Sequence, residues 1–159
     1  MSATDTTIRP YAPDDMIAAV GLWYRAWHES RPGERHVFPI EEWRERWLRW
    51  VVPSAAIQVA VVDGGVVGYV AVVPGAPWQS HVIVTPEYRR RGIGRQLVDA
   101  AEVAGAGELV FDVFEVDADA RSFYAGCGFE PGETVAHPRT AEPMVRYTWT
   151  ANASPAARV

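Results

Sequence analysis

Three consecutive arginines stand directly before a Gly-x-Gly triplet in the segment YRRRGIGRQL, residues 88–97. Apolar residues at helical spacing follow the triplet, so we expect a helix to begin there. A helix N-terminus presents unpaired backbone N–H groups and the positive end of the helix dipole, and both stabilise an anion. Glycines at positions 92 and 94 leave room for the backbone to approach that anion. The segment is therefore a candidate cradle for a pyrophosphate group.

The better-known phosphate-binding motifs do not fit this segment. The third glycine of Gly-x-Gly-x-x-Gly would fall at Leu97, and the chain contains no Gly-Lys-Ser or Gly-Lys-Thr. An ordinary basic helix start, exposed to solvent, explains the same residues equally well. The segment alone leaves both interpretations open.

The composition limits the size of the protein and the kinds of partner. With 159 residues, 48% of them hydrophobic, the chain can bury one sizeable core. We therefore expect a single α/β domain over residues 1–150 and a disordered tail over residues 151–159. A net charge of -5 argues against a nucleic-acid or membrane-surface partner. All fifteen basic side chains are arginines, which excludes a lysine nucleophile or base.

The cysteine, the histidines and the apolar runs indicate the compartment and the absence of a metal. The one cysteine, Cys127, cannot form an intramolecular disulfide, and the first ten residues lack the basic and apolar regions of a secretory signal. No apolar run approaches the roughly 18 residues of a membrane span. We therefore expect a soluble cytoplasmic protein. The four histidines lack the spacing of a metal site, so we expect no metal.

Sequence periodicity predicts the order of the elements. A strand over residues 7–11 precedes a helix that ends near His28, and a second helix covers residues 40–51. Two β-branched runs flank Asp-Gly-Gly at 63–65, which predicts a hairpin. The remaining elements are a strand at 81–84, the helix after the arginines, a strand at 109–114, a short helix opened by Asp117, and strands near 129–135 and 144–149. The arginines therefore lie on a strand-to-helix turn.

Two segments resemble signatures of one enzyme family. VTPEYRRRGIGRQLVDAA, residues 84–101, resembles the acetyl-CoA signature of the GCN5-related N-acetyltransferases, the GNAT family. DADARSFYAGCGFE, residues 117–130, is similar to that family's Asn-x-x-Ala-x-x-Phe-Tyr-x-x-x-Gly-Phe segment. The order and spacing of the expected elements agree as well, so the resemblance covers nearly the whole chain.

The resemblance implies an α/β (α+β) fold with a mixed, twisted central sheet, flanked by helices and splayed between its fourth and fifth strands. The pantetheine arm of acetyl-CoA would lie in that split, where Ile83 and Val84 would offer backbone groups. Asp117 stands where the family usually has Asn; it keeps an acceptor oxygen for the cofactor but loses the amide donor. The residues that carry over to the pyrophosphate cradle are Arg89, Arg90, Arg91, Gly92, Ile93, Gly94 and Arg95.

Acetyl transfer to an amine needs a neutral amine, a stabilised oxyanion and a proton for the departing thiolate. The Val84 N–H is the expected oxyanion donor if the splay leaves it unpaired. Tyr124 falls seven residues after Asp117, where similar enzymes carry a tyrosine near the cofactor sulfur, so we expect it to be the acid. The alternative is a core tyrosine that packs the short helix.

Two residues compete for the role of general base. Asp112 is the first candidate, because aspartate is disfavoured in strands and its position resembles that of a catalytic glutamate in ribosomal-protein N-terminal acetyltransferases. His81, close to the expected thioester end of its strand, is the rival. An exposed strand aspartate and a structural histidine are the alternatives.

The acceptor is expected to bind beside the break between the first two helices, because this break borders the acceptor site in the resembled family. The tryptophans at helical spacing nearby are more often core residues than pocket residues. The candidate lining residues are Trp27, His28, Arg31, Glu34, His36 and Phe38.

These features predict an acetyl-CoA-dependent N-acetyltransferase that acts directly on a primary amine of a small molecule. The segment GETVAHPRTAEPM, residues 132–144, would obstruct an extended peptide groove, which favours a small acceptor. An enzyme that acetylates protein N-termini or lysines is one alternative, and a non-catalytic acyl-CoA-binding regulatory module is another. The family resemblance also makes a homodimer possible.

Overall fold

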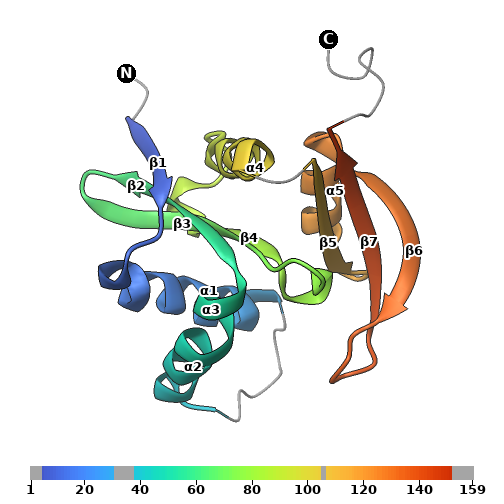
Figure 1. The fold of residues 1–159 in the computed structure, drawn as a ribbon, viewed down its shortest axis with the longest axis horizontal. Helices are drawn as coiled ribbons and strands as arrows, with labels where there is room; N and C mark the ends of the chain where they lie inside the picture. Colours follow the sequence, from blue (N-terminus) through green and yellow to red (C-terminus); the bar gives the residue numbers. More distant parts are fainter. Residues whose placement is uncertain (1–4, 31–37, 105–106, 152–159) are drawn as a thin grey trace.

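The computed structural model describes residues 5–30, 38–104 and 107–151. Its strands form two sheets that lie side by side (Figure 1). The first has the order β1-β2-β3-β4, with bounds Thr6–Pro10, Ala56–Val62, Gly65–Val72 and His81–Val84. The second has the order β5-β7-β6, with bounds Glu108–Phe114, Pro143–Thr150 and Glu130–Ala136.

The division between the sheets falls between β4 and β5, as the family resemblance implies. The α/β class is also confirmed, since helices flank both sheets (Figure 1). All described strand pairs are antiparallel, so the expected mixed sheet is present as two antiparallel sheets. The predicted hairpin joins β2 and β3 through Asp63 and Gly64, whose φ values of 51° and 80° suit a tight turn between twisted strands.

Helices cover both faces of the first sheet. On one face lie a short 3-10 turn at Pro13–Asp15, then α1 (Met16–Ser30), α2 (Ile40–Arg46), a π-helical turn at Trp47–Val51, and α3 (Val52–Ser54). On the other face lies α4 (Ile93–Ala104) (Figure 1). Trp43 and Trp47 are buried in the core between α1, α2 and the sheet, as their helical spacing predicts.

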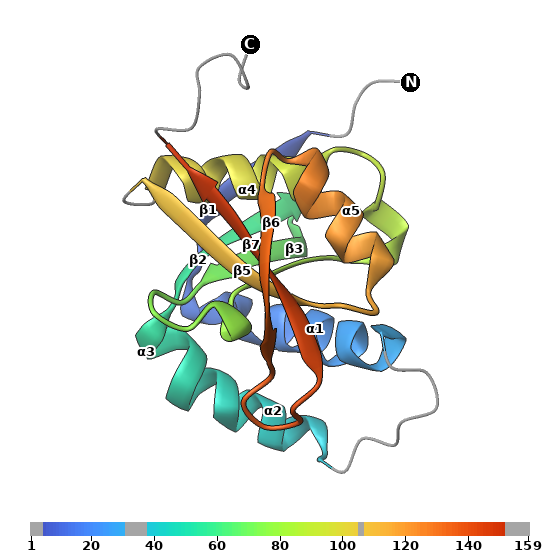
Figure 2. The same cartoon turned by 90° about the vertical axis from the view of Figure 1, so that its right-hand side faces the viewer.

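The second sheet is covered by α5 (Ala118–Gly126), seen beside β6 and β7 in Figure 2. The predicted opening of this helix is confirmed, because the Asp117 carboxylate accepts a hydrogen bond of 3.0 Å from the Ala120 N–H. Phe111, Tyr124 and Phe129 pack together where α5 meets β5. Short 3-10 turns at Pro77–Gln79 and Pro86–Tyr88 lie on either side of β4.

None of the described helices has the length and apolar composition needed to cross a bilayer. Of the tail expected from residue 151 onward, only Ala151 belongs to the described part of the chain.

Candidate active site

Along the edge of β4 that faces the split, every second residue directs its backbone N–H and C=O groups away from β3. The Thr85 N–H donates to the Val67 carbonyl at 2.8 Å, so this pair bonds across β3 and β4. Bonding alternates along an antiparallel ladder, which directs the backbone of Ile83 to β3 and that of Val82 and Val84 to the split. Of the two predicted backbone partners, Val84 has the orientation that a ligand in the split needs. Ile83 does not, and the sequence analysis missed Val82.

Tyr124 reaches the same edge from the opposite side of the split. Its ring stacks on Phe111 of β5 with a centroid distance of 5.0 Å, and its hydroxyl accepts a hydrogen bond from the Val82 backbone. The side chain is buried, and burial raises the pKa of the hydroxyl above its ordinary value. Tyr124 therefore packs in the core and also places its hydroxyl at the split. Both interpretations of its sequence position, a core tyrosine and a residue near the cofactor sulfur, are compatible with this placement.

The glycine turn before α4 has the backbone shape that its sequence suggests. Arg90 and Gly92 have positive φ values of 62° and 82°, and the space next to the Gly92 Cα is open. Gly94 has a different reason to be glycine, because a Cβ there would lie 2.8 Å from the Phe123 ring. The expectation that both glycines clear space for an anion is therefore supported at Gly92, whereas Gly94 allows α4 to pack on α5.

The arginines of this turn divide into two groups. Arg89 donates from Nε to the Val84 carbonyl at 2.9 Å, and Arg95 donates to the Gly126 carbonyl at 2.9 Å, so both hold the turn against its neighbours. Arg90 and Arg91 are exposed, and the Arg91 guanidinium lies 4.9 Å from the centroid of the Tyr88 ring. Ile93 is buried beneath the turn, and its N–H belongs to the first turn of α4, where helix geometry provides no carbonyl partner.

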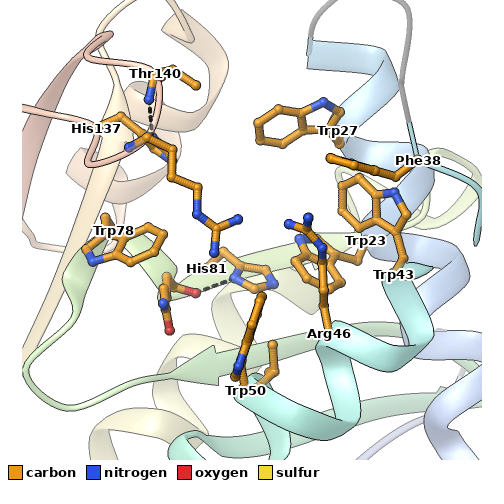
Figure 3. Close-up of a pocket in the computed structure, with 13 residues that line it drawn as sticks. Trp23, Trp27, Phe38, Trp43, Arg46, Trp50, Trp78, His81, His137 and Thr140 are labelled. Atoms are coloured by element: carbon orange, nitrogen blue, oxygen red, sulfur yellow. Dashed lines mark hydrogen bonds between the residues drawn. The ribbon is translucent and has the colours of Figure 1, made fainter.

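A cavity of about 290 Å³ lies on the other face of the first sheet, next to α1 and α2 (Figure 3). Two of the predicted acceptor residues, Trp27 and Phe38, line it. His28 is not among the lining residues; its ring packs on Tyr24 and its Nδ1 lies 2.7 Å from the Tyr24 carbonyl. The predicted residues Arg31, Glu34 and His36 lie outside the described residues. The full described lining is Trp23, Trp27, Phe38, Trp43, Arg46, Trp50, Val51, Trp78, Gln79, His81, His137, Arg139 and Thr140.

Most of this lining was not predicted from the sequence. Trp78 follows β3, and His137 and Arg139 belong to the hairpin between β6 and β7, so both segments come from far along the chain. The segment 132–144, which we predict to obstruct a peptide groove, borders the cavity through His137, Arg139 and Thr140. No local sequence signal marks these residues as neighbours of α1 and α2, because tertiary packing alone brings them together.

His81 lies in the wall of this cavity at the start of β4 (Figure 3). Its Nδ1 is 2.7 Å from the Gln79 carbonyl, which can only accept, so Nδ1 carries the proton. Its Nε2 then accepts from the Tyr69 hydroxyl at 2.6 Å. Burial lowers the pKa of His81 to about 4, although the Gln79 carbonyl opposes this shift. The imidazole is therefore neutral at neutral pH.

Asp112 has a different environment from the one expected of a base. Its carboxylate accepts two hydrogen bonds from Arg146, at 2.8 and 3.0 Å, across the β5–β7 pair. Its side chain is 2% exposed, and it does not line the cavity. Asp112 thus forms a buried ion pair that joins two strands, and the guanidinium occupies both of its oxygens.

The two sheets, divided between β4 and β5 and flanked by helices, have the arrangement of the GNAT fold. A family model described as an acetyltransferase (GNAT) domain matches residues 53–131, and the chain belongs to this family. The described residues contain no group of three or more His, Cys, Asp or Glu side chains that could hold a metal ion.

Solved structures share this fold, and one curated relative matches part of the chain. An N-acetyltransferase from Staphylococcus aureus Mu50 superposes with a TM-score of 0.72 and 17% identity, covering 94% of this chain and 100% of that one. The yncA protein of Salmonella typhimurium, solved with its cofactor acetyl-CoA, has a TM-score of 0.67 and 16% identity, covering 95% and 96% of the two chains. Mycothiol acetyltransferase of Tsukamurella paurometabola is 38% identical over 76 residues. That match covers 47% of this chain but only 26% of the relative.

Proposed function

We propose that this chain is an acetyl-CoA-dependent N-acetyltransferase that passes the acetyl group directly to a primary amine of a small molecule. The observation that carries the proposal is the split between β4 and β5, with the glycine turn of α4 on one face and the aromatic cavity on the other. A thioester donor held from the first face and an amine held from the second would meet at this split. Direct transfer is supported by Cys127, which lies outside the cavity lining and whose thiol pKa is raised by burial.

Acetyl-CoA supplies the acetyl group as an activated thioester. We assign its pyrophosphate to Gly92, to the first-turn N–H groups of α4 and to the exposed Arg90 and Arg91. Arg89 and Arg95 position the turn, since their guanidinium groups already bind backbone carbonyls. Asp117 caps α5 with its carboxylate, and we assign it this structural role rather than a cofactor contact.

Two groups in the split serve the transfer. The Val84 N–H is directed away from β3 and is the proposed donor to the oxyanion. A tyrosine hydroxyl is protonated at neutral pH, and burial raises the pKa of Tyr124 further, so the group serves as a hydrogen-bond donor to the departing thiolate. The hydrogen bond from Val82 holds the Tyr124 oxygen at the edge of β4, where that thiolate would form.

We propose His81 rather than Asp112 as the group that receives the amine proton. His81 lines the cavity and is neutral, whereas Asp112 is held by Arg146 outside it. A pKa of about 4 makes His81 a weak base toward an ammonium group, and Tyr69 must release Nε2 first. The apolar cavity offsets part of this difference, since desolvation lowers the pKa of a bound amine.

The test is the release of free thiol from acetyl-CoA with a panel of small amines and short peptides, comparing the wild type with Tyr124→Phe. We expect turnover with small amines, and a kcat that falls about 100-fold in the variant while the KM for acetyl-CoA changes little. Tyr147→Phe is the matched control, because Tyr147 is also buried near Phe111 and its hydroxyl binds Arg121 instead of the split. An unchanged kcat in Tyr124→Phe would remove Tyr124 from the mechanism, and turnover of peptides alone would reject the small acceptor.

A further inference from the structure

The charged side chains among the described residues of the aromatic cavity are arginines. The thirteen described residues that line it include no Asp or Glu, and they include Arg46 and Arg139 (Figure 3). A site for a polycationic amine needs carboxylates to balance the ligand charge, and this described lining offers arginines in their place. The cavity therefore disfavours polyamines and favours a ligand that brings its own negative charge.

Arg139 is held over the cavity by the hairpin between β6 and β7. The Nδ1 of His137 accepts hydrogen bonds from the backbone N–H groups of Arg139 and Thr140, at 3.1 and 3.2 Å, which fixes the shape of the hairpin tip. The Arg139 guanidinium then lies 5.6 Å from the centroid of the Trp50 ring and 5.8 Å from that of Trp78. Within the described part of the chain, it has these aromatic contacts but no ion pair with a carboxylate.

Arg46 approaches the same tryptophan from α2. Its guanidinium lies 4.5 Å from the Phe38 centroid and 5.7 Å from that of Trp50. Its described carboxylate partner is Glu42, one helical turn away, at 3.8 Å. This distance is at the outer limit of an ion pair, so most of the hydrogen-bonding capacity of Arg46 is left for another group.

Two guanidinium groups beside one indole ring form a site for an anion. Arginine presents its donors in a planar fork that matches a carboxylate, and stacking on aromatic rings holds that fork in place. The two positive charges repel each other, and an anion bound between them would offset this repulsion. The rest of the lining is aromatic, with Trp23, Trp27 and Trp43 opposite Trp78, so the body of the ligand is expected to be flat and apolar.

We propose that the acceptor is a small primary amine that carries both an aromatic ring and a carboxylate, as an aromatic amino acid does. Its ring would lie among the tryptophans, its carboxylate between Arg46 and Arg139, and its amine toward His81. This inference rests on the proposed function, since it names the acceptor of the same reaction. The cavity volume of about 290 Å³ corresponds to roughly ten water volumes, which suits a ligand of this size and not a peptide.

Matched pairs of acceptors test the role of the carboxylate. We compare L-phenylalanine with phenethylamine and L-tryptophan with tryptamine, and we add spermidine as the polycation. A charge-assisted pair with arginine predicts a kcat/KM about 10- to 100-fold higher for the carboxylated member of each pair, and little activity on spermidine. In Arg139→Gln, the preference should fall about 10-fold, through the KM for the carboxylated amine rather than through kcat. Arg49→Gln is the control, because Arg49 lies on the same helical segment as Trp50 but pairs with Glu45 and does not line the cavity.

The outcomes separate this inference from the proposed function. Equal or better turnover of phenethylamine, tryptamine or spermidine would overturn the inference and leave the acetyltransferase proposal standing. If no amine releases thiol, calorimetric titration of L-phenylalanine and phenethylamine into the CoA-saturated protein decides the question. Binding of L-phenylalanine that weakens in Arg139→Gln would then support the ligand class and reject the enzyme. Absence of such binding would overturn the inference.

Discussion

His81 shows how burial sets the properties of a single side chain at this site. The ring lies between Trp23 and Tyr69, and both of its nitrogens have partners. Its folded-state pKa of about 4 lies below the value of about 6.5 expected in the unfolded chain. Between these two values the unfolded state binds more protons than the folded state. His81 therefore makes the protein less stable as the pH falls from 6.5 to 4, and contributes no pH dependence above that window.

The variant His81→Gln tests this linkage. The wild type should lose stability relative to the variant as the pH falls through this window, by at most roughly 1.4 kcal/mol per pH unit. The free energy of unfolding is measured in urea for both proteins at pH 4.5, 5.5 and 7. The difference between the two proteins at each pH isolates the contribution of His81, because the titration of the carboxylates is common to both. A difference that does not change with pH would mean that His81 titrates normally in the folded protein.

At the scale of elements, the start of α4 contains two glycines with different functions. The positive φ of 82° at Gly92 strains any other residue, and a side chain there would enter the open space proposed for the pyrophosphate. At Gly94, the side chain would instead meet Phe123 of α5. One glycine thus belongs to the ligand site and the other to the contact between two helices.

Gly92→Val and Gly94→Ala should therefore fail in different ways. Gly92→Val should weaken acetyl-CoA binding at least about 10-fold and cost about 1–2 kcal/mol of stability through backbone strain. Gly94→Ala should lower the free energy of unfolding by about 1–3 kcal/mol, and Phe123→Leu should restore part of that loss by making room. Calorimetric titration with CoA and urea unfolding measure both effects. Undiminished CoA affinity in Gly92→Val would reject this turn as the pyrophosphate site.

The sequence predicted the elements because their signals are local. Asp63 and Gly64 carry the hairpin turn, and Asp117 carries the cap of α5, so each could be found from neighbouring residues. The cavity could not be found in this way. Arg139 contacts both Trp50 and Trp78 only because the hairpin after β6, the turn after β3 and the π-helical turn at Trp47–Val51 meet at one cavity. The partner of Asp112, Arg146, was missed for the same reason, since strand register alone joins them.

At the scale of the whole molecule, one apolar cluster joins the two sheets. Among the described strands they share no backbone ladder, yet residues of β2, β3 and α4 pack with residues of β5, α5 and β7. Leu97 of α4 is fully buried in this cluster. The split between β4 and β5 is thus an opening within one folded unit, closed on the α4 side by side-chain packing.

Leu97→Ala should therefore affect both sheets together. We expect a loss of about 2–5 kcal/mol in the free energy of unfolding, with one cooperative transition in both circular dichroism and scanning calorimetry. Val103→Ala, a change at an exposed position of the same helix, should alter stability by less than about 0.5 kcal/mol. Two separate transitions in Leu97→Ala would mean that the sheets unfold independently.

The lining of the cavity also gives the protein an optical property. Five of the seven tryptophans in the chain, at positions 23, 27, 43, 50 and 78, line the cavity. Most of the side chains that emit in the ultraviolet therefore surround the proposed acceptor site. Occupation of the cavity should change the intensity and the wavelength of that emission, so the protein carries its own reporter of acceptor binding and needs no attached dye.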